Sequence, residues 1–153
     1  MSEIAWEPYL EVAPTASEAD IARVEATLGV RFPDALRALL RQHQGRMPSP
    51  NVLHAPGISP LTLGPLLHVA QDAGDEAEYG ILEQVQTWSE YGPGLIPIAD
   101  HGGGGVFALD ISASADAPPV VFVSPEAAPG DPHARIRVAS GVDELLQRLG
   151  PDQ

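Results

Sequence analysis

The hydrophobic pattern is densest between Leu95 and Ser124, where it predicts three short β-strands. Apolar runs cover residues 95–99, 106–111 and 120–123, and turn residues separate them. The last run contains only valine and phenylalanine, whose shapes favour a buried, pleated surface. Because the connection over residues 112–119 is short, we expect the last two strands to form an antiparallel hairpin.

Two residues interrupt this apolar pattern, and each places a requirement on the sheet. Pro97 cannot donate a ladder hydrogen bond, so it suits a sheet edge or the end of a strand. Asp110 lies in an otherwise apolar run, and a buried carboxylate needs a partner or a route to solvent. The polar residues 100–105 between the first two strands are predicted to form a turn.

Helical periodicity precedes the strands and predicts a pair of short helices. The first helix begins after Ser17, which suits an N-cap, and ends at Gly29. The second begins at Pro33 and ends near Gly45. The apolar positions expected to face the core are Ile21, Val24 and Leu28 in the first helix and Leu36, Leu39 and Leu40 in the second.

The rest of the chain is predicted to add short elements. Residues 1–16 show no clear periodicity, so we expect an extended lead-in that docks its aromatic side chains on the body. Further predicted elements are short strands at 52–54, 61–63 and 135–138, an acidic turn at 72–78, a helix that begins near Ile81 and ends near residues 91–94, and a last helix capped by Ser140 and ended by Gly150 and Pro151.

This order of elements favours an α+β fold. We expect a single domain over residues 1–153, in which an antiparallel-rich sheet is packed by an N-terminal two-helix unit, a middle helix and a C-terminal helix. The strands should contribute Ile98, Phe107, Leu109, Val121 and Val123 to one core, and the helices should contribute Leu28, Leu36, Leu40, Leu145 and Leu149.

Composition limits the classes that the chain can belong to. A chain of 153 residues can bury a sizeable core without covalent staples. It contains no cysteine, which excludes disulfides, thiolate metal ligands and a cysteine nucleophile. No apolar run approaches the roughly 18 residues of a membrane span, and the first residues are acidic rather than a basic leader. We therefore expect a cytoplasmic protein.

The net charge is the most unusual feature of the composition. It is −13 at neutral pH, and every basic residue is an arginine. The acidity is regional, because no basic residue lies between Arg46 and Arg135, whereas acidic residues recur from Asp72 to Asp131. A negative field repels nucleic acid and anionic membranes and attracts basic proteins. Excess acidic residues also serve solubility alone, and the sequence leaves both explanations open.

The glycine run after His101 resembles the oxyanion loop of some lipases, but the chain has no Gly-x-Ser-x-Gly nucleophile elbow. A phosphate-binding loop would lead into a helix and, in its Walker form, would need lysine. This run leads into a predicted strand, and lysine is absent. We therefore predict a structural turn in which several residues need a positive φ, formed by Gly102, Gly103, Gly104 and Gly105.

The remaining titratable residues form no recognisable catalytic or metal-binding pattern. The five histidines lack the spacing of a zinc site. Asp100 and His101 are adjacent in a turn, where side chains usually point apart, and nothing in the sequence brings Asp110 and Asp116 together. We assign no catalytic residue, no cofactor and no metal, and expect a protein that is not an enzyme.

Several segments, taken in order, carry a resemblance to a known family. Residues 16–45 contain a helix ending in Leu-Gly-Val, then an apolar residue, a proline, a second helix and a glycine. Residues 95–111 contain an apolar strand with proline, a glycine-rich turn and a strand ending in aspartate, and residues 118–149 add a strand and a closing helix. Together they resemble the SUKH superfamily (SMI1/KNR4-like) over about residues 15–149, with 1–14 as the lead-in. Gln44 stands where the family pattern has asparagine.

The resemblance implies an α+β binding module that is not defined by a catalytic set. Many SUKH proteins are bacterial immunity proteins that neutralise a cognate toxin, often a nuclease, and others resemble eukaryotic regulators that act through protein contacts. It favours an immunity protein that binds a basic toxin domain, with no direct contact to nucleic acid or membrane. A cytosolic regulatory or scaffold protein is the alternative, and a small-molecule-binding or enzymatic role comes third.

The acidic segment without basic residues is the candidate partner-binding surface, because an unneutralised acidic face suits a basic protein. Its carboxylates are expected to face solvent. Trp88 and Tyr91 would serve as aromatic anchors if they are exposed, whereas burial of Trp88 in the core is the alternative. The candidate residues are Asp72, Asp75, Glu76, Glu78, Glu83, Trp88, Glu90 and Tyr91.

Overall fold

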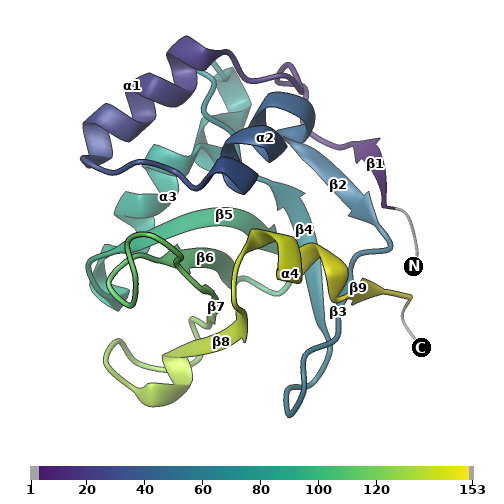
Figure 1. The fold of residues 1–153 in the computed structure, drawn as a ribbon, viewed down its shortest axis with the longest axis vertical. Helices are drawn as coiled ribbons and strands as arrows, with labels where there is room; N and C mark the ends of the chain where they lie inside the picture. The colour runs from purple at the N-terminus through teal and green to yellow at the C-terminus, as the bar shows by residue number, and fades with distance from the viewer. Residues whose placement is uncertain (1–3, 152–153) are drawn as a thin grey trace.

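The computed structural model describes residues 4–151, in which a curled antiparallel sheet of seven strands is packed by helices (Figure 1). The strand order in this sheet is β8-β7-β6-β5-β4-β3-β9. The strands are β3 (Val52–Leu53), β4 (Leu61–Leu66), β5 (Leu95–His101), β6 (Val106–Asp110), β7 (Val120–Val123), β8 (Arg135–Ala139) and β9 (Leu149–Gly150). A separate two-stranded sheet joins β1 (Ala5–Pro8) to β2 (Arg46–Ser49).

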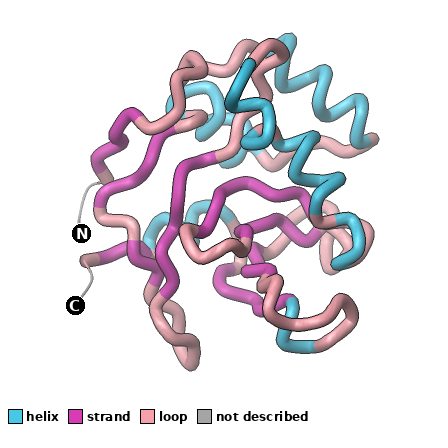
Figure 2. The backbone as a smooth tube through the Cα atoms, turned by 180° about the vertical axis from the view of Figure 1, so that it is seen from behind, coloured by secondary structure: helices cyan, strands magenta, loops and turns pink. Residues whose placement is uncertain are grey.

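The N-terminal helix pair and the middle helix lie toward one end of the molecule, and two loops extend from the other end (Figures 1 and 2). The four α-helices are α1 (Glu18–Leu28), α2 (Asp34–His43), α3 (Ile81–Thr87) and α4 (Val142–Gln147). Three short 3-10 helices are η1 (Gly74–Tyr79), η2 (Ser89–Tyr91) and η3 (Pro132–Ala134). The two loops lie between β3 and β4 and between β7 and η3. The α+β prediction is confirmed.

The three predicted central strands are confirmed as β5, β6 and β7, each antiparallel to the next. Phe107 pairs with Phe122, whereas Val121 pairs with Ala108, so Phe107 and Val121 point to opposite faces of the sheet. Every residue of β6 is buried, which shows that both faces are covered. All ten predicted core residues belong to or pack against one cluster, and only Leu28 among them is partly exposed.

Asp110 has the partner that its apolar surroundings require. The Nη1 of Arg135 donates to its Oδ2 at 3.0 Å, and the Nη2 of the same guanidinium donates to the carbonyl of Tyr91 at 2.8 Å. Arg135 therefore connects β6, β8 and the end of η2 through a single side chain.

The predicted N-terminal helix pair is confirmed with its caps. The Oγ of Ser17 accepts a hydrogen bond from the amide of Asp20 at 3.1 Å, which satisfies one free amide of the first turn. Gly29 ends α1 with a φ of 70°, a conformation that glycine adopts without steric cost. α2 runs from Asp34 to His43, and its side chains Leu36, Leu39 and Leu40 are buried as expected.

The lead-in is more regular than predicted, because its residues 5–8 form β1 against β2. Trp6 docks as expected and stacks on His43 with ring centroids 4.6 Å apart. Tyr9 does not dock, since it is 55% exposed. A four-residue strand that contains proline is too short to show a period, and its partner lies about forty residues away.

The end of the chain also differs from the expectation. α4 stops at Gln147, and Leu149 and Gly150 form β9 beside β3 instead of continuing the helix. The N-cap position is Gly141, and the amide of Ser140 donates to the carboxylate of Glu144. Pairing with a distant strand outweighs the local helical pattern, which is a common way for tertiary structure to override propensity.

The glycine-rich segment forms the turn between β5 and β6, but the expected set of positive φ values is wrong. Only Gly104 among the four has a positive φ, at 102°. Gly105 is required for a different reason, because a Cβ there would lie 2.6 Å from both the Phe122 ring and the carbonyl of Val123. The close approach of β7, rather than backbone conformation, therefore explains the last glycine.

Candidate partner-binding surface

Five of the predicted carboxylates form an unneutralised acidic surface along η1, α3 and η2. All five are exposed, and no ion pair within residues 4–151 includes any of them. We refer to this set as the acidic surface; its members are Asp72, Asp75, Glu78, Glu83 and Glu90.

Glu76 has a different place from the other carboxylates, and the expectation that it faces solvent is wrong. Its carboxylate accepts hydrogen bonds from the backbone amides of Glu11 at 2.8 Å and Val12 at 3.0 Å. The side chain is only partly exposed, because the lead-in lies against it. Glu76 therefore attaches the lead-in to η1 and gives the acidic surface a fixed neighbour.

The two aromatic candidates are not exposed anchors. Trp88 is 8% exposed, and its Nε1 donates to the Oε1 of Gln84 at 3.0 Å. Tyr91 is partly buried, lies 5.2 Å from the Trp88 ring, and donates its hydroxyl to the carbonyl of Ala127. Trp88 is thus a core residue, which is the alternative that the sequence left open.

A buried histidine holds η1 in place. His68 is 1% exposed, and its Nδ1 accepts from the amide of Ala70 at 3.1 Å, so Nδ1 carries no proton. The proton therefore lies on Nε2, which donates to the carbonyl of Glu76 at 2.8 Å. The backbone of His68 bonds to Tyr79 and Ile81 as well. These contacts hold η1, which carries part of the acidic surface, against the segment after β4.

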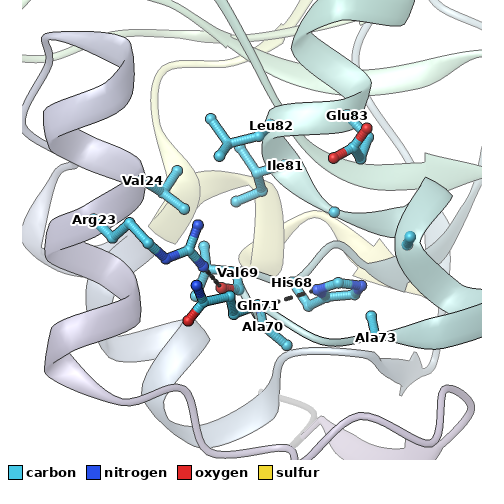
Figure 3. Close-up of a pocket in the computed structure, with 12 residues that line it drawn as sticks. Arg23, Val24, His68, Val69, Ala70, Gln71, Ala73, Ile81, Leu82 and Glu83 are labelled. Carbon is cyan, nitrogen blue, oxygen red and sulfur yellow. Dashed lines mark hydrogen bonds between the residues drawn. The ribbon is translucent and has the colours of Figure 1, made fainter.

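A small hollow lies beside this histidine, between α1, α3 and the segment after β4 (Figure 3). Its volume is about 80 Å³, far below the several hundred that a small-molecule site usually offers. Arg23 reaches across it from α1, and its Nη2 donates to the carbonyl of Val69 at 2.7 Å. The small volume and the Arg23 contact across it indicate a structural role for this hollow.

Two residues missed by the sequence reasoning extend the acidic surface toward the lead-in. Burial raises the pKa of Tyr79, and the charges of Tyr9, Asp100, Glu78 and Glu76 raise it further, so each of these groups acts electrostatically on the Tyr79 hydroxyl. Asp100 is half-buried, and burial also raises its pKa, with a smaller contribution from Glu78. Tyr9 and Asp100 come from distant parts of the chain, so no local pattern could have placed them here.

Gln44 is a buried side chain that bridges separate segments of the chain. It is 2% exposed, its Nε2 donates to the carbonyl of Ala13 at 2.8 Å, and its Oε1 accepts from the amide of Val69 at 3.0 Å. One amide side chain thus joins the lead-in, the end of α2 and the segment before η1.

The described residues contain no group of three or more histidine, aspartate or glutamate side chains arranged to hold a metal ion. Within residues 4–151 no helix is both long and apolar enough to cross a membrane. The exposed carboxylates and the exposed Tyr9 form a negatively charged surface with an aromatic side chain, which suits contact with cationic groups of a macromolecule.

Comparison with known protein families matches residues 15–148 to the SMI1 / KNR4 family (SUKH-1). A search of curated proteins found no match. The matched range begins just before α1 and extends through α4, so it contains the central strands, the glycine-rich turn and the acidic surface. The chain therefore belongs to the SMI1 / KNR4 family (SUKH-1).

Proposed function

We propose that this protein is a non-catalytic immunity protein that binds and neutralises a basic bacterial toxin domain. SUKH domains are known immunity proteins, and the family membership supports this class. The observation that carries the proposal for this chain is the acidic surface, whose five exposed carboxylates have no cation within ion-pair distance in the described part of the chain.

The acidic surface is suited to association as well as to solubility, because hydrogen bonds attach its segment to the rest of the fold. His68 fixes η1 through its backbone and ring, and Glu76 attaches the lead-in that presents Tyr9. A preorganised surface loses less conformational entropy on binding than a flexible acidic loop. Tyr9 supplies the kind of exposed aromatic side chain that often carries binding energy.

Binding kinetics with a toxin domain encoded beside the gene test this proposal. Replacing Asp75, Glu78 and Glu83 by lysine should slow association by about tenfold or more, because exposed charge steers encounter. The effect should shrink as salt rises, since the screening length is about 10 Å at 0.1 M.

A matched control carries three lysines at exposed, unpaired acidic positions elsewhere, namely Asp116, Glu126 and Asp143. It has the same net charge as the test variant, so it separates local from overall electrostatics. If both triple variants slow association equally, the acidic surface has no specific role in binding and serves solubility. Failure of the wild-type protein to bind the toxin would favour the regulatory or scaffold alternative.

A further inference from the structure

The lead-in carries the one large hydrophobic side chain that is exposed within residues 4–151. This side chain is Tyr9, which is 55% exposed and belongs to no aromatic ring pair among those residues. The other aromatic residue of the segment, Trp6, is partly buried and stacks on His43. The Tyr9 ring therefore remains open to a group from outside the chain.

The backbone on both sides of Tyr9 is attached to the fold. β1 ends at Pro8, immediately before it. The amides of Glu11 and Val12, shortly after it, donate to the Glu76 carboxylate at 2.8 and 3.0 Å. An exposed side chain on an attached backbone loses less conformational entropy on binding than one on a mobile segment. Glu76 thus helps to determine where the Tyr9 ring lies.

The side chains that follow Tyr9 alternate between the fold and solvent. A Cβ added at Gly45 would lie 2.9 Å from the Val12 side chain and 3.1 Å from that of Leu10, so these two partly buried side chains pack closely over the residue that follows the end of α2. Tyr9 and Glu11 alternate with them and are exposed. The lead-in therefore packs through Leu10 and Val12 and presents Tyr9 and Glu11 to solvent.

Carboxylates flank Tyr9 along the chain. Glu7 and Glu11, each two residues from Tyr9, are exposed and belong to no ion pair in the described part of the chain. Glu76 attaches the same segment to η1, which carries part of the acidic surface. This environment suits a cation, because an aromatic ring face and unneutralised carboxylates both attract positive charge.

Arg46 is the basic residue opposite this segment, and it lies on the other face of the small sheet. It pairs with Pro8, so its side chain shares a face with that of Trp6, whereas Glu7 alternates to the opposite face. Burial and the charge of Arg46 lower the pKa of His43, on which Trp6 stacks. Arg46 therefore acts on the His43 side and leaves the exposed carboxylates beside Tyr9 unpaired.

Charge complementarity indicates the group that this surface would accept. A second copy of the chain is disfavoured, because each copy has a net charge of −13 and would present the same carboxylates. A cationic side chain of a different protein is favoured. Arginine suits the site better than lysine, since its planar guanidinium stacks on an aromatic ring and donates several hydrogen bonds to carboxylates.

We propose that Tyr9 is a contact residue for the partner and accepts an arginine side chain, which stacks on the Tyr9 ring near the carboxylates of Glu7 and Glu11, and that Glu76 positions this ring. The inference rests on the proposed function, because it names one contact of the same basic partner. It adds the lead-in to the interface and specifies the partner group that the lead-in recognises.

The first test compares two peptides of equal charge, acetyl-hexa-arginine-amide and acetyl-hexa-lysine-amide, by calorimetric titration of the full-length protein at low salt. Tyr9→Leu should weaken binding of the arginine peptide about twofold to fivefold and should affect the lysine peptide less. Tyr9→Phe, which keeps the ring, should bind as the wild type does. An unchanged affinity for the arginine peptide in Tyr9→Leu, equal losses for both peptides, or no binding of the arginine peptide up to millimolar concentration would overturn the inference.

The second test determines whether Glu76 acts through Tyr9. Glu76→Gln removes one charge and leaves a single oxygen to accept both amides, so the ring should be held less firmly. Glu83→Gln is the matched control, because it removes the same charge from an exposed carboxylate that has no ion pair within residues 4–151. Glu76→Gln should weaken binding of the arginine peptide about twofold more than the control does, and this excess should vanish in the Tyr9→Leu background. Equal losses, or an excess that persists without the ring, would show that Glu76 does not position Tyr9.

These outcomes are distinguishable from failure of the proposed function. If Tyr9→Leu has no effect while the triple lysine variant of the acidic surface still slows toxin association, the Tyr9 contact is wrong and the acidic surface keeps its role. If the toxin domain does not bind while Tyr9→Leu still weakens binding of the arginine peptide, the arginine contact stands and the toxin is the wrong partner.

Discussion

The ion pair between Arg135 and Asp110 offers the sharpest test of how the central strands are held together. Arg135→Leu removes a guanidinium that donates to the Asp110 carboxylate at 3.0 Å and to the Tyr91 carbonyl at 2.8 Å. The two side chains are 28% and 12% exposed, so water can replace the lost contacts only in part. Ser112 continues to donate to Asp110 through its amide and hydroxyl.

These contacts set the expected magnitude. Breaking a buried pair costs about 3–5 kcal/mol, and the donors from Ser112 together with partial exposure place this case at the lower end, at about 2–4 kcal/mol. Asp110→Asn should cost less, about 1–2 kcal/mol, because an amide oxygen can still accept a hydrogen bond from Arg135, although the charge of the carboxylate is lost. A double-mutant cycle should then give a coupling of about 1–2 kcal/mol.

Urea unfolding followed by circular dichroism gives the free energies of unfolding for this cycle. Arg137→Leu is the matched control, because this arginine lies two positions along the same strand, is exposed and has no ion pair in the described chain; we expect a change within about 0.5 kcal/mol. A cost below about 1 kcal/mol for Arg135→Leu, or a coupling near zero, would refute the reasoning.

Three further changes test the core, the turn and the pH response. Leu40→Ala should lower the free energy of unfolding by about 2–5 kcal/mol, and a change well under 1 kcal/mol would contradict its place in the core. Gly105→Ala should cost about 1–3 kcal/mol because its Cβ meets β7, whereas Gly102→Ala, with open space around it, should be nearly neutral in the same denaturation assay. The pKa of His43 is lowered by burial and by Arg46, so His43 binds a proton less readily in the folded protein than in the unfolded chain. Stability should therefore fall as pH drops below the unfolded value of 6.5, and His43→Phe should weaken this dependence in unfolding measured at several pH values.

The sequence predicted the elements whose signal is local. The runs that became β5, β6 and β7 are almost wholly apolar, and α1 carries its own N-cap and terminal glycine. β1 and β9 were missed because each has four residues or fewer and exists only through a distant partner. A two-residue strand such as β9 has no period to detect, and its residues instead continued a helical pattern.

The candidate surface was predicted only in part, because some of its contacts also depend on distant segments of the chain. The absence of basic residues along the segment correctly indicated exposed and unpaired carboxylates, because a charge without a neighbour must remain solvated. The contacts of Glu76 with the lead-in, and the proximity of Tyr9 and Asp100 to Tyr79, depend on segments far apart in the sequence. Trp88 could have faced either way on a short helix, and only its contact with Gln84 and the core decides the matter.

The attachment of the lead-in has a consequence for how the native protein opens. Its hydrogen bonds outside β1 go mainly to single groups at distant positions, among them the Glu76 carboxylate, the Gln44 amide and the carbonyl of Gly45. Few buried apolar side chains reinforce them, so residues 5–14 should detach as one unit at a lower free energy than the seven-stranded sheet requires to unfold. A partner that covers Tyr9 would then keep this segment attached. Part of the binding free energy would stabilise the attached form, and hydrogen exchange of the Glu11 and Val12 amides would become slower.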